Sequence, residues 1–163
     1  MAAEISFDIV SQYDEQELVN ALDQTRREVG TRYDLKDTHT EIEQDKRGLT
    51  ITTASEFTLK QVLDVLESKM VKRSLSLKIL KPGKVEPASG AKVRQTFELQ
   101  AGISQDLARQ ISKLVRDKYP KSRTQIQGDQ VRVFSKSRDE LQGVIALLKA
   151  QDYSVPLQFV NYR

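Results

Sequence analysis

The feature that most constrains the fold is an internal repeat, in which two segments of the chain align with an offset of 84 residues. Residues 40–53 and residues 124–134 each contain two runs of alternating apolar and polar side chains, joined by a turn with Asp beside Lys or Gly. Such a pattern predicts a β-hairpin. A serine then precedes a helical pattern in both copies, at Ser55 and at Ser137, and a serine is a preferred helix N-cap.

The sequence flanking the hairpins repeats as well. A short alternating strand, at residues 6–10 or 96–99, is followed by a helix with apolar side chains at i, i+4 and i+7. Each copy ends in a strand, at residues 75–79 or 157–161. Residues 81–90 contain Pro, Gly and Ser without periodicity, which predicts a connecting loop. The order of elements in each copy is therefore β, α, β, β, α, β.

This order is the split βαβ, or ferredoxin-like, pattern. We predict an α+β protein with two ferredoxin-like domains, at residues 1–91 and 92–163. Each domain is a four-stranded antiparallel sheet with two helices on one face, and its other face is open to water or to a ligand.

The residues that most enzymes use are nearly absent. The chain has no Cys, and its single histidine, His39, lies in a polar stretch without a Ser or Cys motif to partner it. Neither a Walker loop nor a G-x-G-x-x-G motif occurs. We therefore expect a protein that is not an enzyme and has no cofactor and no metal. The lack of Cys, of a signal peptide and of a long apolar run predicts a cytoplasmic protein with no membrane partner.

Charge is divided unevenly along the chain. Residues 1–91 have 13 Lys and Arg against 16 Asp and Glu, a net charge of −3, whereas residues 92–163 have 13 against 7, a net charge of +6. An anionic partner of the second half is one interpretation. A solubilising surface that is merely uneven is the other, and both stay open at this point.

Alternation along the strands predicts which side chains lie on the open faces. In the first copy Leu77 is expected inward, and the carboxylates Asp8, Glu41 and Glu43 outward. In the second copy Ile126 is expected inward. Its open face is expected to combine Arg132, the aromatic residues Phe134 and Tyr162, and several amides, which can stack on bases and bind their edges. An ordinary solvated sheet surface is the competing interpretation. The candidate nucleotide-binding residues are Arg132, Phe134, Lys136, Arg138, Gln125, Gln127, Tyr162 and Arg163.

Several segments together resemble the bacterial YajQ family from end to end. They are residues 6–11, 25–28, 32–36, 125–133, 136–142 and 157–163. The resemblance implies a cytosolic pair of ferredoxin-like domains described as nucleotide-binding, with RNA and cyclic di-guanylate as associated ligands. It also implies that strand 5–11 pairs in the second sheet and strand 92–101 in the first. The chain departs from the family pattern at residues 33–37, where Leu35 replaces an aromatic residue and Asp37 a glycine.

Two hypotheses about function follow. The first is a non-enzymatic protein that binds RNA or a guanine nucleotide, including a cyclic dinucleotide, through its basic second half. The second is a protein-interaction or signalling adaptor that acts through the acidic face of the first domain. The charge asymmetry also predicts a homo-oligomer formed by head-to-tail association.

Overall fold

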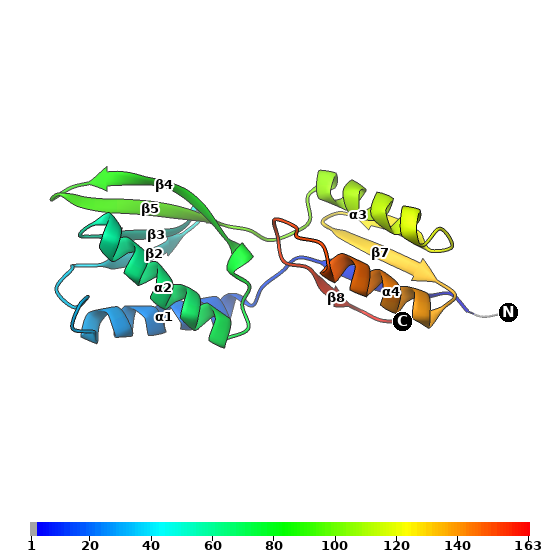
Figure 1. Cartoon of the computed structure of the whole chain (residues 1–163), viewed down its shortest axis with the longest axis horizontal. Helices are drawn as coiled ribbons and strands as arrows, with labels where there is room; N and C mark the ends of the chain where they lie inside the picture. Colours follow the sequence, from blue (N-terminus) through cyan, green and yellow to red (C-terminus); the bar gives the residue numbers. More distant parts are fainter. Residues whose placement is uncertain (1–2) are drawn as a thin grey trace. The chain divides into compact units, whose positions relative to one another are not determined.

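A computed structural model describes residues 3–163 and divides the chain into two compact units (Figure 1). The central unit is contiguous and comprises Tyr13–Gln100. The terminal unit combines the residues up to Gln12 with Ala101–Arg163. The two units are described separately below.

The central unit is a four-stranded antiparallel sheet with strand order β2-β3-β5-β4. Apolar side chains of two helices pack with those of the sheet into one core, so the helices cover one face. The elements are α1 (Glu15–Thr31), β2 (Glu41–Asp45), β3 (Gly48–Thr53), α2 (Glu56–Lys72), a short 3₁₀ helix η1 (Leu77–Ile79), β4 (Leu80–Ala88) and β5 (Lys92–Leu99).

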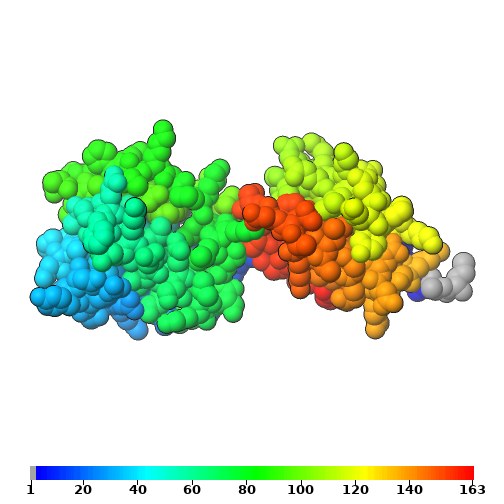
Figure 2. Space-filling model, viewed as in Figure 1, coloured from blue at the N-terminus to red at the C-terminus, as the bar shows by residue number. Residues whose placement is uncertain are grey.

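The terminal unit has the same architecture, with strand order β6-β7-β1-β8 and antiparallel pairs throughout. Its two helices also share one core with the sheet, and their atoms, yellow-green to orange, form much of the surface visible in Figure 2. The elements are β1 (Ile5–Val10), α3 (Gln105–Lys118), β6 (Arg123–Gln127), β7 (Gln130–Ser135), α4 (Arg138–Lys149) and β8 (Gln158–Val160).

The helices begin where the serine signals predict. The hydroxyl oxygen of Ser55 accepts a hydrogen bond from the backbone N–H of Thr58, and that of Ser137 accepts one from Glu140, at 3.1 and 3.2 Å. Each bond satisfies an N–H group that would otherwise lack a partner in the first helical turn. The prediction of two four-stranded antiparallel sheets, each with two helices, is confirmed.

The strands at the start of the two repeats are exchanged. β1 lies between β7 and β8, with Asp8 opposite Arg132, whereas β5 lies between β3 and β4, with Thr96 opposite Thr50. The terminal unit therefore reads β, α, β, β, α, β along the chain, with the central unit inserted after its first strand. The central unit has its first strand last, so it is a circular permutation of the same fold. The residues of the two units therefore differ from the contiguous ranges 1–91 and 92–163 that the sequence repeat predicted.

The interpretation of residues 81–90 as a connecting loop is wrong, because most of them form β4. This strand pairs with β5 through a hairpin whose turn contains Gly90 at φ 77°. Pro82 and Pro87 obscured the strand in the sequence, but β4 is at the edge of the sheet, where a proline without an N–H group is tolerated. The strand expected at residues 75–79 is instead largely η1, and Leu77, expected inward, is 39% exposed.

The exchange also redistributes charge. The central unit has 15 Lys and Arg against 15 Asp and Glu, a net charge of zero, and the terminal unit has 11 against 8, a net charge of +3. β1 brings Asp8 into the terminal unit, and β5 brings Lys92 and Arg94 into the central one. The difference of nine charges between the halves of the sequence thus falls to three between the folded units.

Candidate functional site

A buried carboxylate lies on the face of the terminal sheet that α3 and α4 do not cover. Phe7 and Ile9 of β1 point into the core with the helices, so Asp8 between them points to the opposite face. Asp8 is nevertheless only 2% exposed. Its Oδ1 accepts a hydrogen bond from Arg132 Nε at 2.7 Å, and its Oδ2 accepts one from Asn161 Nδ2 at 2.9 Å.

These contacts keep Asp8 ionised. The hydrogen bond from Arg132 lowers the pKa of the Asp8 carboxyl below its ordinary value, and the bond from Asn161 and the charge of Arg163 lower it further. Burial acts in the opposite direction and is the weaker effect. Asp8 and Arg132 therefore form a charged pair across two adjacent strands, and the guanidinium is already partly neutralised before any ligand arrives.

Phe134 on the same open face is also in contact with a neighbouring side chain. The guanidinium carbon of Arg123 lies 4.1 Å from the centre of its ring, and Arg123 Nη2 is 2.8 Å from a carboxylate oxygen of Glu4. Gln125 stands opposite Arg132, and Gln127 opposite Gln130. Both Arg123 and Arg132 on this face thus have an acidic partner, and amides are prominent among the remaining side chains.

The C-terminal segment changes sides after β8. Val160 stands opposite Asp8, yet two backbone hydrogen bonds, of 3.1 and 3.0 Å, pair Ser6 with Arg163 rather than with Tyr162. The segment therefore contains one extra residue, a β-bulge, and Asn161 within it adopts the left-handed conformation at φ 59°. The bulge reverses the alternation of side chains, and the centre of the Tyr162 ring lies 6.0 Å from the centre of the Phe7 ring in the core. The expectation that Tyr162 lies on the open face is therefore wrong.

Beside this segment is a pocket of about 450 Å³, which we call the C-terminal pocket. Its side chains combine an exposed aromatic ring, arginine, an amide and apolar groups. The ring is Tyr162, which is 59% exposed. No ion pair engages Arg138 among residues 3–163. The lining residues are Ile5, Ser6, Arg138, Leu141, Gln142, Tyr162 and Arg163.

Seven of the eight predicted site residues therefore divide into two groups. Arg138, Tyr162 and Arg163 line the C-terminal pocket. Four others lie on the open face, and Lys136 is exposed in the turn between β7 and α4 and belongs to neither group. The residues of the open face are Arg132, Phe134, Gln125 and Gln127.

Two participants were missed in the sequence. Gln142 lines the pocket four residues after Arg138, so their spacing on one helix face was a usable signal. Asn161 was missed although Asn adopts positive φ more readily than most residues, because its contact with Asp8 lies 153 residues away in the sequence. Ile126, expected inward on the edge strand β6, is 37% exposed, since few core side chains reach this edge of the sheet.

The open face of the central unit is mixed in charge rather than acidic. It is hollowed by a cavity of about 600 Å³, lined on one side by Glu41, Glu43 and Asp45 of β2. Lys92 and Arg94 also line it, because the exchange places β5 in this sheet. The acidic patch expected from the sequence is therefore balanced by cations from a strand that the sequence repeat had assigned to the other domain.

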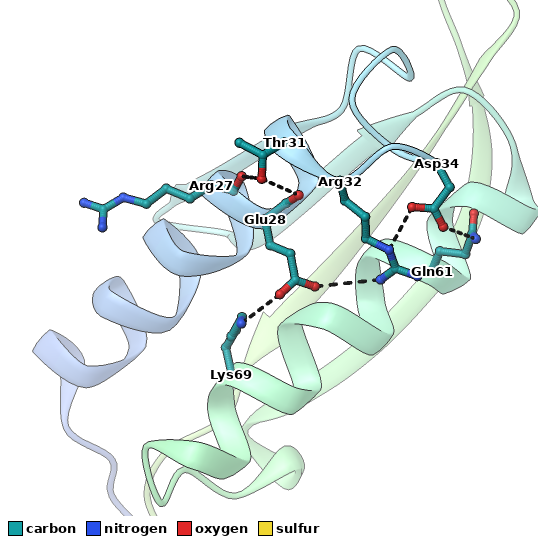
Figure 3. Close-up of polar contacts among 7 residues, drawn as sticks. All are labelled: Arg27, Glu28, Thr31, Arg32, Asp34, Gln61 and Lys69. Carbon is teal, nitrogen blue, oxygen red and sulfur yellow. Dashed lines mark hydrogen bonds and ion pairs between the residues drawn. The ribbon is translucent and has the colours of Figure 1, made fainter.

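A polar network on the helix side of the central unit joins α1 to α2 (Figure 3). Glu28 is 2.9 Å from Lys69 and 3.7 Å from Arg32, and Arg32 in turn is 2.7 Å from Asp34. Asp34 also accepts a hydrogen bond from Gln61 of α2 at 3.1 Å. The network fixes the turn after α1, which is the segment where the sequence departs from the family pattern.

The described residues show neither of two other kinds of site. Across residues 3–163, no cluster of three or more His, Asp or Glu side chains could hold a metal ion. No helix within the same range is long and apolar enough to cross a bilayer.

The fold and the pocket define the class, a tandem ferredoxin-like protein with an aromatic and cationic pocket in one unit. The family model described as "nucleotide-binding protein YajQ-like" matches residues 5–163, and this chain belongs to that family. A relative in Thermosynechococcus vestitus is 58% identical, and one in Roseiflexus castenholzii is 56% identical, each over the full length of both chains. A third relative, in Trichodesmium erythraeum, is 56% identical over the same extent. All three are named nucleotide-binding proteins.

Proposed function

We propose that this chain is a non-enzymatic cytoplasmic protein that binds RNA or a guanine nucleotide, including a cyclic dinucleotide, in the C-terminal pocket. The observation that carries the proposal is that Tyr162 and Arg138 line one pocket of the terminal unit. The names of the relatives support nucleotide as the ligand class.

The chemistry of the pocket suits one nucleotide. A base stacked on the Tyr162 ring would gain about 1 to 3 kcal/mol of binding free energy. The apolar side chains of Ile5 and Leu141 would pack against the parts of the base that Tyr162 does not cover. The Gln142 amide can both donate to and accept from a base edge. A volume of about 450 Å³ lies within the usual range for small-molecule sites and leaves the rest of an RNA or dinucleotide outside.

Arg138 is the best candidate for the phosphate contact. It is the first residue of α4, where a cation is unfavourable to the helix dipole, so helix stability does not explain it. Acidic residues, which favour the dipole, occur in the first turns of α1, α2 and α3, and also in α4, where Asp139 and Glu140 follow Arg138. A phosphate beside Arg138 would gain a charge-assisted hydrogen bond as well as the positive end of the dipole.

The alternative function, a protein adaptor acting through an acidic face of the first domain, loses the observation that motivated it. Arg94 and Lys92 share that face with the carboxylates, and the central unit has no net charge. The same zero net charge removes the opposite charges on which the prediction of head-to-tail association depended.

The test is titration of fluorescently labelled single-stranded RNA and labelled cyclic di-guanylate by anisotropy. We expect Tyr162→Ala and Arg138→Ala each to weaken binding about tenfold, the effect of losing roughly 1.4 kcal/mol. Arg109→Ala, which removes an exposed arginine of α3, is the matched control and should bind like wild type. RNA affinity should also fall as salt rises, because phosphate contacts release counterions.

Two results would overturn the proposal. Failure of the wild type to bind either probe would reject nucleotide binding. Undiminished binding by both pocket variants would reject the pocket, and a loss confined to Gln125→Ala would move the site to the open face of the sheet.

A further inference from the structure

We infer that Asp8 and Asn161 are positioning residues, whose hydrogen bond on the open face sets where Tyr162 stands in the C-terminal pocket. This inference rests on the proposed function, because it concerns the same pocket. Neither side chain is among the residues that line that pocket. Their effect on a ligand would therefore pass through the backbone of residues 161–163.

The first step is the conformation of Asn161. Its φ of 59° is in the left-handed region, which costs most residues other than glycine roughly 1 to 2 kcal/mol and costs Asn less. The amide of Asn161 donates to Asp8 Oδ2 at 2.9 Å, which holds the residue on the open side of the sheet. The hydrogen bond to Asp8 of β1 thus offsets the free-energy cost of the left-handed conformation of Asn161.

The second step is the fixed position of Asp8. Its other oxygen accepts from Arg132 Nε at 2.7 Å, and the side chain of Asp8 is only 3% exposed. Arg132 and Asp8 belong to neighbouring strands and stand directly opposite each other. The hydrogen bond from Arg132 of β7 therefore fixes the orientation of the Asp8 carboxylate, so its Oδ2 is held in one position for Asn161.

The third step is the consequence of the bulge. Without the extra residue, the register that pairs Asp8 with Val160 would continue and place Tyr162 opposite Ser6, on the open side. With it, Arg163 pairs with Ser6, and Tyr162 turns towards Phe7 and the pocket. The aromatic wall of the pocket therefore depends on a hydrogen bond made on the opposite face of the sheet.

The experiment uses three variants of the full chain, Asn161→Ala, Asn161→Gly and Asp8→Asn. Tyrosines are replaced by 3-fluorotyrosine, and the ¹⁹F resonance of Tyr162 is assigned from its loss in Tyr162→Phe. We expect this resonance to shift in Asn161→Ala and Asp8→Asn without any ligand, and affinity for labelled cyclic di-guanylate to fall about fivefold.

Asn161→Gly separates the hydrogen bond from the backbone conformation. Glycine adopts positive φ without a steric cost, so this variant keeps the bulge while losing the amide, and its binding should fall only about twofold. Arg109→Ala is again the control and should change neither the resonance nor the affinity. Because Asn161 is exposed, its variants test the inference even if Asp8→Asn fails to fold.

The outcomes distinguish this inference from the proposed function. An unmoved Tyr162 resonance in Asn161→Ala would overturn the positioning role, while a loss of binding in Tyr162→Ala would still support the pocket. If the resonance shifts in Asn161→Ala but both Asn161→Ala and Tyr162→Ala bind like wild type, the pocket is not the nucleotide site, and Asp8 and Asn161 have no role in binding.

Discussion

The exchange of β1 and β5 predicts a disulfide that only one strand pairing allows. Thr50 and Thr96 stand opposite each other on β3 and β5, and their hydroxyl oxygens are 3.3 Å apart. Directly opposed residues of antiparallel strands have Cα atoms at a separation that a disulfide can bridge. Because the natural chain has no Cys, the double variant Thr50→Cys/Thr96→Cys would contain a single possible intramolecular bridge.

The bridge closes a loop of roughly 45 residues, for which the chain-entropy relation gives about 4 kcal/mol of stabilisation. For a unit of this size that corresponds to a rise in Tm of about 15 to 30 °C, and strain in the bridge will reduce it. The assay compares the oxidised and reduced forms by mass spectrometry and by thermal unfolding at low protein concentration, where bridges between chains are rare.

The control is Thr50→Cys/Asp8→Cys. Thr50 of β3 and Arg132 of β7 each lie five residues before the N-cap serine of the next helix, Ser55 or Ser137, so their positions are equivalent. Asp8 stands opposite Arg132, so an unexchanged β1 would place Asp8 opposite Thr50. We expect no bridge within the chain in this control. A bridge in the control together with none in Thr50→Cys/Thr96→Cys would refute the strand exchange.

Four further predictions concern stability, each measured by urea unfolding with hydrogen exchange to separate the two units. Asp8→Asn should destabilise the terminal unit by about 1 kcal/mol or more at neutral pH. Because the folded pKa of Asp8 is lowered, its contribution is complete above the ordinary value of 3.8 and is lost as pH falls through the folded pKa. A stability difference between wild type and Asp8→Asn that persists at lower pH would contradict this. Gly48→Ala should cost about 3 kcal/mol or more, since the new Cβ would overlap the backbone carbonyl of Phe97 at φ 130°. Gly90→Ala, at φ 77° in open space, should cost only about 1 to 2 kcal/mol. Glu28→Gln should change stability by less than about 1 kcal/mol, because its ion pairs are at the surface.

The apolar pattern predicted the architecture well. The inward faces of both sheets, such as Leu49 and Ile51 or Val131 and Val133, are fully buried as alternation requires. The same pattern could not identify the partner of each strand. Phe7 and Phe97 satisfy either core equally, so hydrophobic burial leaves the exchange undetermined, and only the resemblance pointed to it.

The candidate site was less accessible from the sequence, because alternation fails wherever the backbone departs from a regular strand. The bulge at Asn161 moved Tyr162 to the other side of the sheet, and the tolerance of Asn for positive φ was too weak a signal to predict it. Arg132 was predicted correctly as an outward residue, but its pairing with Asp8 depends on the contact between β1 and β7. The sequence therefore predicted which types of residue face outward, but it did not predict which of them are free to bind a ligand.

The insertion of the central unit within the terminal one has a consequence for synthesis on the ribosome. Residues 13–100 are contiguous, so this unit can fold as soon as Gln100 has emerged. β1 is made first, yet its neighbours β7 and β8 lie more than a hundred residues later in the sequence. At about 5 to 20 residues per second, β1 waits on the order of ten seconds with Phe7, Ile9 and Val10 uncovered. During this interval the apolar strand is a natural substrate for a chaperone, and slower translation of the second half would lengthen its exposure.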